Sequence, residues 1–329
     1  MRRPLLALAL LALAAGSAPA VQELGGLRVA TSSGTFLKID ISPRAAAMGG
    51  AWVAVASDAA AVWYNPAGLG QLAHRQFFAS YVAWPADIHY ANALVSLPQP
   101  LLRGNVAFQL GSLTTSLDET DEYHPYGTGR SFRFSDLVLG AAYARPMTDQ
   151  LYLGLTLKYI REDLGSAVGG PVTNAWTIDV GTLYHMAYAN TRIGMAIANF
   201  GPELKPAGSY WNHSEEKSEE YEGFPPPSTF KLGLAFEPWK RYPWLLTQTL
   251  EMNHLADNQE TLATGLELSY LGGLLALRTG YNFMADEMGF AAGFGVNTLL
   301  GAAMAGLDYA YTDGNSLGGI HRWAIRVDF

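Results

Sequence analysis

The chain has 329 residues, 49% of them hydrophobic and 15% charged, with a formal net charge of −8. It contains no cysteine, which excludes disulfide bonds, thiolate metal sites and lipid attachment to an N-terminal cysteine. An acidic chain without a basic stripe is not expected to bind nucleic acid.

The N-terminus has the three parts of a secretory signal peptide. Met1–Arg3 is positively charged, residues 4–15 are apolar, and Ala18–Ala20 supplies small residues for cleavage. The apolar run is too short to remain as a membrane-spanning anchor. We therefore expect residues 1–20 to be removed after export. Loss of both arginines from 21 basic residues leaves 19 against 29 acidic ones, a net charge of −10 for the mature chain.

Residues 21–73 lack strand-like alternation and contain two short helix signals instead. In Ser42–Gly50 the serine can cap a helix, the following proline suits its first turn, and two glycines close it. In Asp58–Leu69 the aspartate can cap a second helix, which ends where Pro66 excludes Asn65 from the helical region. Both helices are rich in alanine and small enough to form a hatch inside a narrow lumen. The alternative is an ordinary periplasmic extension.

Residues 74–329 contain fourteen segments in which apolar and polar side chains alternate. Residues 261–270 show the pattern well, with a leucine-rich row on one face and a row of small and charged residues on the other. Successive side chains of a strand point to opposite faces, so each segment predicts a strand with one apolar side. The segments are 76–84, 87–97, 104–114, 131–145, 150–162, 173–186, 191–200, 228–237, 243–255, 260–271, 273–283, 287–297, 302–312 and 319–329.

The connections between these segments favour a closed barrel over a soluble sandwich. Outer-membrane barrels have an even number of strands, short periplasmic turns and longer outer loops. The longest connections, 115–130, 163–172 and 201–227, all fall at the same end if the C-terminus is periplasmic. The last segment ends on Phe329, and in this it resembles the closing strand that barrel-assembly machinery recognises. We therefore predict an all-β, 14-stranded antiparallel transmembrane β-barrel in the outer membrane of a two-membrane bacterium, surrounded by lipid.

Strand parity predicts which charges enter the lumen. Both signs of charge are present. This favours a network of paired charges that holds the hatch, and it argues against an ion filter with charges of a single sign. We expect Asp40 or Asp58 to be the hatch partner if Arg322 or Arg326 reaches it. The inward charges are Lys158, Asp179, Lys231, Glu237, Glu267, Arg278, Asp308, Arg322 and Arg326.

Aromatic residues gather near the ends of the segments, where rings with one polar tip suit the membrane interfaces. They are Tyr81, Trp84, Tyr159, Trp239, Tyr242, Trp244, Tyr270, Tyr281, Tyr309, Tyr311 and Trp323.

The sequence carries no recognisable catalytic or metal-binding motif. None of the seven histidines forms a close pair suited to metal ligation, and no Gly-x-Ser-x-Gly motif is present. Acidic runs at 118–122 and 214–220 could bind calcium, but their spacing matches no calcium loop, which favours a solvated surface. We therefore expect no enzyme activity, no cofactor and no metal.

The motifs of the N-terminal segment, taken in order, resemble a known family. Arg44-Ala-Ala-Ala-Met-Gly-Gly-Ala51, Asp58 and Asn65-Pro66-Ala67-Gly68-Leu69 look like the N-terminal signature of the PorV/PorQ group, within the wider FadL-like outer-membrane transport family. The resemblance covers essentially the whole mature chain. Further fragments that agree are residues 201–206, 227–234, 278–281, 293–297 and 308–311.

This resemblance implies a plugged fourteen-stranded barrel and leaves two functions open. FadL-like members admit small hydrophobic molecules, whereas PorV/PorQ-type members serve a type IX secretion system and hold exported proteins at the cell surface. The resemblance gives the hatch motif a structural or gating role. Its residues are Arg44, Met48, Gly49, Gly50, Asp58, Asn65, Pro66 and Gly68.

Overall fold

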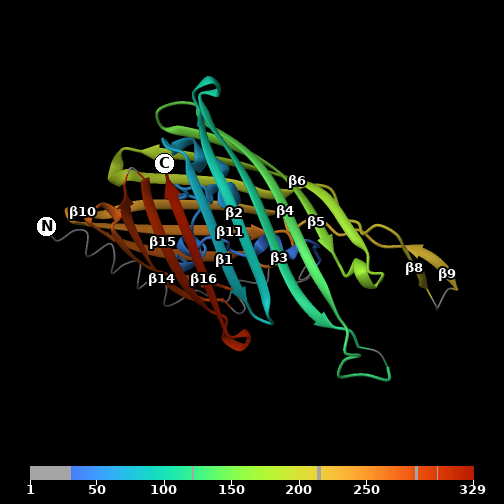
Figure 1. Ribbon diagram of the computed structural model, residues 1–329. Coiled ribbons are helices and arrows are strands. Elements are labelled where there is room, and N and C mark those ends of the chain that lie inside the picture. Colours follow the sequence, from blue (N-terminus) through green and yellow to red (C-terminus); the bar gives the residue numbers. More distant parts are fainter. Residues whose placement is uncertain (1–30, 121, 213–215, 286–287, 302) are drawn as a thin grey trace, which may run out of the picture.

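The computed structural model describes residues 31–120, 122–212, 216–285, 288–301 and 303–329. Fourteen antiparallel strands form a closed barrel around a small N-terminal unit, as Figure 1 shows. The predicted fold is confirmed, whereas the signal peptide expected at residues 1–20 lies outside the described residues. The barrel strands are β1 (Gln76–Trp84), β2 (Ile88–Gln99), β3 (Gly104–Asp118), β4 (Ser131–Pro146), β5 (Leu151–Asp163), β6 (Val172–Met186), β7 (Thr191–Phe200), β10 (Thr229–Arg241), β11 (Trp244–Leu255), β12 (Thr261–Tyr270), β13 (Leu275–Phe283), β14 (Phe290–Leu300), β15 (Ala303–Asp313) and β16 (Gly319–Asp328).

The strands follow one another around the barrel in chain order, and β1 pairs with β16 to close it. Among the described pairings the register shifts twice, once between β6 and β7 and once between β10 and β11. The first shift lies beside Asn199, whose φ of 59° is in the left-handed region that asparagine tolerates better than most residues. A bulge of this kind turns a side chain without opening the barrel.

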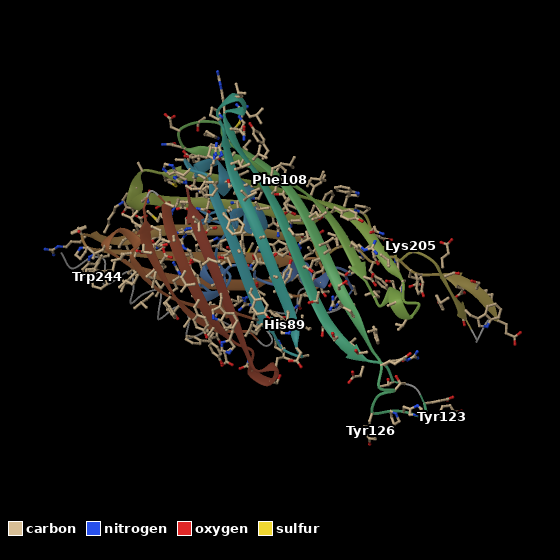
Figure 2. The ribbon with its side chains drawn as sticks, viewed as in Figure 1. His89, Phe108, Tyr123, Tyr126, Lys205 and Trp244 are labelled. Atoms are coloured by element: carbon tan, nitrogen blue, oxygen red, sulfur yellow. The ribbon has the colours of Figure 1, made fainter. Side chains whose placement is uncertain are left out.

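The outer surface of the wall is apolar, as lipid requires. On β5, Leu153, Leu155 and Leu157 are exposed, whereas Thr156 and Lys158, which alternate with them, are buried. In Figure 2, Phe108 lies on the outside of the wall, and Trp244 marks the end opposite to Tyr123, Tyr126 and Lys205. Within the described residues, no helix has the length and apolar character needed to cross a membrane.

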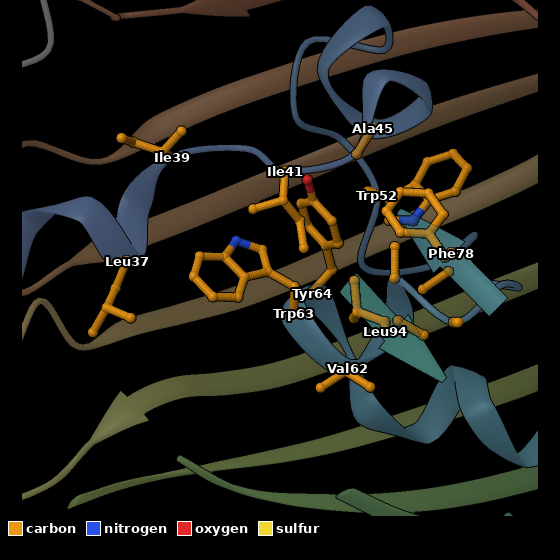
Figure 3. Close-up of a cluster of buried hydrophobic side chains, with 14 of the residues drawn as sticks. Leu37, Ile39, Ile41, Ala45, Trp52, Val62, Trp63, Tyr64, Phe78 and Leu94 are labelled. Atoms are coloured by element: carbon orange, nitrogen blue, oxygen red, sulfur yellow. The ribbon is translucent and has the colours of Figure 1, made fainter. Parts of the chain in front are cut away.

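The N-terminal unit lies inside the barrel and forms its hydrophobic core. It consists of η2 (Thr35–Lys38), α2 (Pro43–Ala47), α3 (Ala61–Tyr64) and η3 (Pro66–Gln71). We call residues 31–73 the hatch. Figure 3 shows its side chains, including Trp52, Trp63 and Tyr64, packed together with Phe78 of β1 and Leu94 of β2. Burial of apolar surface therefore fixes the hatch in the lumen.

Local signals in the hatch sequence act only in part as expected. Asp58 accepts a 3.1 Å hydrogen bond from the N–H of Ala60, but its expected role as the cap of the second helix is wrong, because Ala60 is the N-cap of α3 and no side chain caps that helix. Asn65 leaves the helix with a φ of −154° and accepts a hydrogen bond from the N–H of Ala67 at 3.1 Å. The expected side-chain cap from Ser42 is wrong, because Ser42 precedes α2 without such a bond.

The connections differ between the two ends of the barrel. The inner turns are short and include η4 (Pro100–Leu102), η6 (Tyr188–Asn190) and η7 (Leu271–Gly273), whereas η5 (Ser166–Val168) and η8 (Asn315–Leu317) lie in outer loops. The loop after β7 contains a hairpin, β8 (Ser209–Asn212) and β9 (Lys217–Glu220), that projects beyond the barrel in Figure 1. Sequence analysis missed it, because four-residue polar strands show too little alternation to be recognised.

Glycines on the inner face of the wall allow the hatch to touch the wall backbone. A Cβ on Gly154 would overlap the backbone of Pro66, one on Gly194 would overlap Val53, and one on Gly280 would overlap Met48 and Gly49. Because these atoms belong to the hatch backbone, a side chain could not turn aside to avoid them. The glycines therefore set how closely the hatch fits.

We expect Gly280→Val to lower the free energy of unfolding by about 1–3 kcal/mol, the usual cost of overpacking a well-packed core. Leu277→Val on the lipid face of the same strand is the matched control and should cause a smaller loss. The measurement is denaturant unfolding of the barrel in lipid vesicles, followed by tryptophan fluorescence. Equal losses in the two variants would contradict the close contact at Gly280.

Candidate functional site

A chain of ion pairs joins α2 to the wall. The Arg44 guanidinium donates to both carboxylate oxygens of Glu267 on β12, at 2.9 and 3.0 Å. Glu267 also accepts a 2.6 Å hydrogen bond from Arg278 of β13, which in turn reaches Asp308 of β15 at 2.6 Å. On the hatch side, Arg44 lies 3.8 Å from Asp58. Two-pronged contacts between arginine and carboxylate fix geometry as well as charge, and this chain links α2 to β12, β13 and β15.

A second buried pair lies at the bulge of β7. Lys158 Nζ is 2.6 Å from Asp179 Oδ2, and the exposed side-chain fractions are 1% and 2%. Lys158 also donates to Asn199 Oδ1 at 2.9 Å and lies 4.8 Å from the ring centre of Trp63 in the hatch. The N–H of Asn199 donates to Asp179 at 2.7 Å. The left-handed turn at Asn199 thus completes a polar network under the hatch.

Uncharged amides hold the inner half of the hatch. Asn65, fully buried, donates through Nδ2 to the carbonyl of Val53 at 2.8 Å and to the carbonyl of Thr182 on β6 at 3.0 Å. Asn105 on β3 donates to the carbonyls of Leu69 and Leu72 at 2.8 and 3.0 Å. These bonds satisfy backbone groups that the irregular hatch would otherwise bury without partners.

The two arginines of β16 have different surroundings. Arg322 donates to the backbone carbonyl of Asp40 at 2.9 Å and to Thr312 at 2.7 Å. Arg326 donates to Asn297 of β14 at 2.7 Å. The expected contact between Arg322 and residue 40 is therefore present, but through the backbone. Asp58 pairs with Arg44 in place of Arg326.

The start of the hatch is held at the outer rim. Glu162 near the outer end of β5 accepts from the Ser33 hydroxyl at 3.0 Å and from the N–H of Gly34 at 2.9 Å. Lys38 Nζ lies 2.8 Å from Asp257 in the loop between β11 and β12. Burial alone would raise the pKa of Asp257, but hydrogen bonds from Lys38 and Ser32 outweigh it and hold the pKa below its usual range. At pH values above the ordinary carboxyl pKa of about 3.9, this contact therefore adds to the free energy of unfolding. That contribution is lost as the pH falls through the lowered pKa of Asp257.

Several cavities lie against the hatch, among them an outer one and an inner one. The outer cavity, of about 310 Å³, is lined by apolar and aromatic residues including Leu37, Trp63 and Trp84, and by polar residues including Lys231 and Arg322. The inner cavity, of about 530 Å³, is lined by Arg44, Glu267 and Arg278, and by residues of the inner turns. One cavity thus faces the outer loops and the other the periplasmic end.

The structure places the predicted residues as follows. Met48, Gly49 and Gly50 form the turn after α2, and Asn65, Pro66 and Gly68 lie against β5 and β6 or against the hatch itself. The predicted lumen charges are buried or half-buried on the inner face of the wall, and their role in holding the hatch stays a proposal. Lys231 has no carboxylate within ion-pair distance in the described chain, and its amine lies 5.4 Å from the ring centre of Tyr64.

Sequence reasoning missed several contributors. Glu251 accepts the N–H of Val53 at 2.7 Å, and strand parity on β11 could have placed it in the lumen. Trp84, assigned to an interfacial belt, faces inward and lines the outer cavity. It lies at the end of β1, where the alternation of the strand points its side chain inward, whereas the enrichment of aromatic residues at membrane interfaces led us to expect it outside. Across the described residues, no group of three or more His, Cys, Asp or Glu could hold a metal ion.

Comparison with known proteins supports the fold. No protein-family model matches the chain, and no curated protein matches it in sequence. Solved structures do match. The Ralstonia pickettii toluene transporter TbuX aligns with a TM-score of 0.55 at 14% identity, over 88% of this chain and 97% of that one. The TodX deltaS2S3 mutant, a monoaromatic hydrocarbon channel, gives 0.60 at 12% identity, over 87% and 98%.

A Pseudomonas aeruginosa FadL homologue gives a TM-score of 0.50 at 10% identity, over 88% of this chain and 98% of that one. At such low identities the likeness shows a shared fold, that of FadL-like barrels.

We expect Lys158→Met and Asp179→Asn each to lower the free energy of unfolding by about 3–5 kcal/mol, because each leaves a buried charge unpaired. The double variant should lose less than the two losses added together. Arg130→Ala, which breaks an exposed pair with Glu119, is the control and should cost about 1 kcal/mol or less. Losses that simply add in the double variant would show that the two charges do not interact.

Proposed function

We propose that this chain is an outer-membrane channel that admits small, partly hydrophobic molecules into the outer cavity and passes them by the hatch. The observation that carries the proposal is the outer cavity itself, which lies between the outer loops and the hatch and is lined by Trp63, Trp84 and Met288 as well as by Lys231. A concave site with an apolar lining and a few polar groups is the usual form of a small-molecule site.

Location and partners follow from the wall. The apolar outer surface suits surrounding lipid, and the closing strand that ends at Phe329 suits recognition by barrel-assembly machinery. The FadL-like fold adds support, since TbuX is described as a toluene transporter and TodX as a monoaromatic hydrocarbon channel. A cleaved signal peptide and an absence of enzyme activity remain part of this proposal.

The PorV/PorQ-type role is the second candidate, and one observation favours it. The outer loops carry exposed aromatic residues, including Tyr123 and Tyr126 in the loop between β3 and β4, labelled in Figure 2. Such side chains could hold an exported protein at the cell surface. We prefer uptake, because the cavity beside the hatch has no purpose in a barrel that only anchors a partner.

The test compares uptake of radiolabelled toluene and laurate by intact cells with and without this chain. We expect the chain to raise the initial rate. Ala291→Trp, which places a large ring in the outer cavity, should return the rate to near that of cells lacking the chain. Ala292→Trp on the next, lipid-facing position of β14 is the matched control and should leave uptake unchanged.

If neither probe enters faster in cells that carry the folded wild-type chain, the channel function is wrong. Native mass spectrometry of the purified barrel would then decide for the second candidate if a stoichiometric exported protein leaves with it.

A further inference from the structure

We infer that the route through this barrel runs along its axis, between α2 and strands β12–β14, and that the Arg44–Glu267 contact closes it. The route joins the outer cavity to the inner cavity and so delivers molecules to the periplasmic end. This inference rests on the proposed channel function and adds to it the path, the gate and a narrower class of substrate.

The two cavities are separated by one thin layer of the hatch. Ala46, Gly49 and Gly50 line the outer cavity, whereas Arg44 lines the inner one. A smaller cavity of about 110 Å³, lined by Arg44 and Met48, lies against the same layer. The separating layer is therefore α2 and the turn that follows it. We call Pro43–Gly50 the septum.

The wall shows the same order of residues on three neighbouring strands. On β13, Asn282 lines the outer cavity, Gly280 touches the septum, and Arg278 lines the inner cavity. Four residues of an antiparallel strand span about 14 Å, so the septum is about one helix thick.

The flanking strands repeat this order. On β12, Thr261 lines the outer cavity, Gly265 touches the septum and Glu267 lines the inner cavity. On β14 the corresponding residues are Ala291, Gly293 and Asn297.

The septum packs closely on the wall, but few of its contacts with the wall are polar. The wall offers glycines there, and a Cβ on Gly265 or Gly293 would come within 2.6 or 2.7 Å of the Cβ of Met48 or Ala47. Within the described residues, Arg44 is the one side chain of α2 that hydrogen-bonds the wall, and it does so through Glu267. Close packing and one polar contact therefore hold the septum against the wall, and a shift of the septum breaks no other hydrogen bond between α2 and the wall in the described part of the chain. The remaining hatch is held separately through Asn65, Asn105 and Glu251.

Beside the septum, the described wall has no register shift that could serve as a sideways exit. The bulge between β6 and β7 borders the outer cavity at Asn199, but the polar groups of Asn199 are bound to Asp179, Lys158 and Pro227, so the wall is closed there. The pairs β12–β13, β13–β14 and β14–β15 run without a register shift, as do all described pairs from β1 to β6. Parting such strands would expose several backbone N–H and C=O groups to lipid, at a cost of several kcal/mol for each unsatisfied group. Moving α2 breaks one ion pair with the wall and disturbs the packing of the buried Ala45, Ala47 and Met48, but it leaves the hydrogen bonds between the wall strands intact.

The lining of the inner cavity narrows the class of substrate. Beyond the septum a molecule meets charged side chains, including Arg44 and Glu267, next to apolar ones, including Leu245 and Met304. A purely apolar molecule offers these charged groups no partner, whereas a molecule with an apolar body and a polar group is accommodated on both sides of the septum. Positive and negative side chains are paired, so the sign of the charge is not the basis of selection. The expected substrates are small amphipathic molecules.

The first experiment measures ionic current through the barrel in planar bilayers in potassium chloride. We expect Arg44→Ala to raise the current several-fold over wild type, because the septum loses its anchor, and Glu267→Gln to raise it less. Arg130→Ala in an outer loop is the matched control and should behave as wild type. Resistance of each barrel to unfolding by detergent shows that the variant is folded. A folded Arg44→Ala barrel with wild-type current would overturn the gate.

The second experiment identifies the path and uses the absence of native cysteine. Ser269→Cys places a thiol in the inner cavity, and Leu266→Cys places one on the lipid-facing side of the same strand. A bulky methanethiosulfonate reagent at position 269 should reduce uptake of radiolabelled benzoate by intact cells, and the same reagent at position 266 should not. If wild type takes up benzoate and the adduct at 269 has no effect, the axial path is wrong and the channel function stands. If wild type takes up none of the probes, the channel function itself fails.

Discussion

The contact between the hatch backbone and the glycines of the inner wall is the constraint on which the rest of this structure depends. Fourteen strands enclose more space than their own inward side chains can fill, so a second unit must occupy the lumen. Gly154, Gly194 and Gly280 let that unit approach until backbone meets backbone. The hatch then supplies most of the apolar core of the protein, with Trp52 and Tyr64 at its centre. Barrel and hatch thus share one core, and neither is packed without the other.

The hatch covers charged side chains on the inner face of the wall, and most of these charges are paired with one of the opposite sign. Lys158 pairs with Asp179, and Arg44, Glu267, Arg278 and Asp308 form a continuous chain across three wall strands and α2. A buried pair adds little net stability compared with an apolar pair of similar shape, but it fixes position. We propose that the position fixed in this barrel is that of the septum, and that the same contact controls passage.

Different parts of the hatch are held by different chemistry, and this division matters for function. Amide-to-carbonyl bonds from Asn65 and Asn105 hold the inner half, and carboxylates at Glu162 and Asp257 hold its start at the outer rim. Between them, the septum packs closely on the wall glycines, and among the described residues its one hydrogen-bonding side chain toward the wall is Arg44. The ends of the hatch are therefore held by several polar contacts and the septum by packing and one ion pair, so we place local opening at the septum.

The sequence by itself determined the barrel. Alternation with a period of two, an even number of segments and the parity of loop lengths predicted all fourteen strands within a few residues, because each strand must be apolar on the lipid side and polar within. The same parity placed Lys158, Glu267 and Arg278 in the lumen. Signals around Pro43 and Pro66 predicted two short helices, because such signals act over a few neighbouring residues, but they left open whether this segment enters the lumen.

Only the tertiary structure decided what the lumen residues contact. Arg44 and Glu267 are 223 positions apart, and nothing local relates them. Asn199 joins the Lys158 network because of a bulge that moves one residue out of register, and Trp84 turns inward at a strand end, where the expected belt would turn it outward. The hairpin β8–β9 and the two cavities likewise arise from how separate segments meet. The alternation of a strand shows which of its faces meets lipid and which meets the lumen. Which residues a lumen side chain contacts depends on the packing of the whole chain.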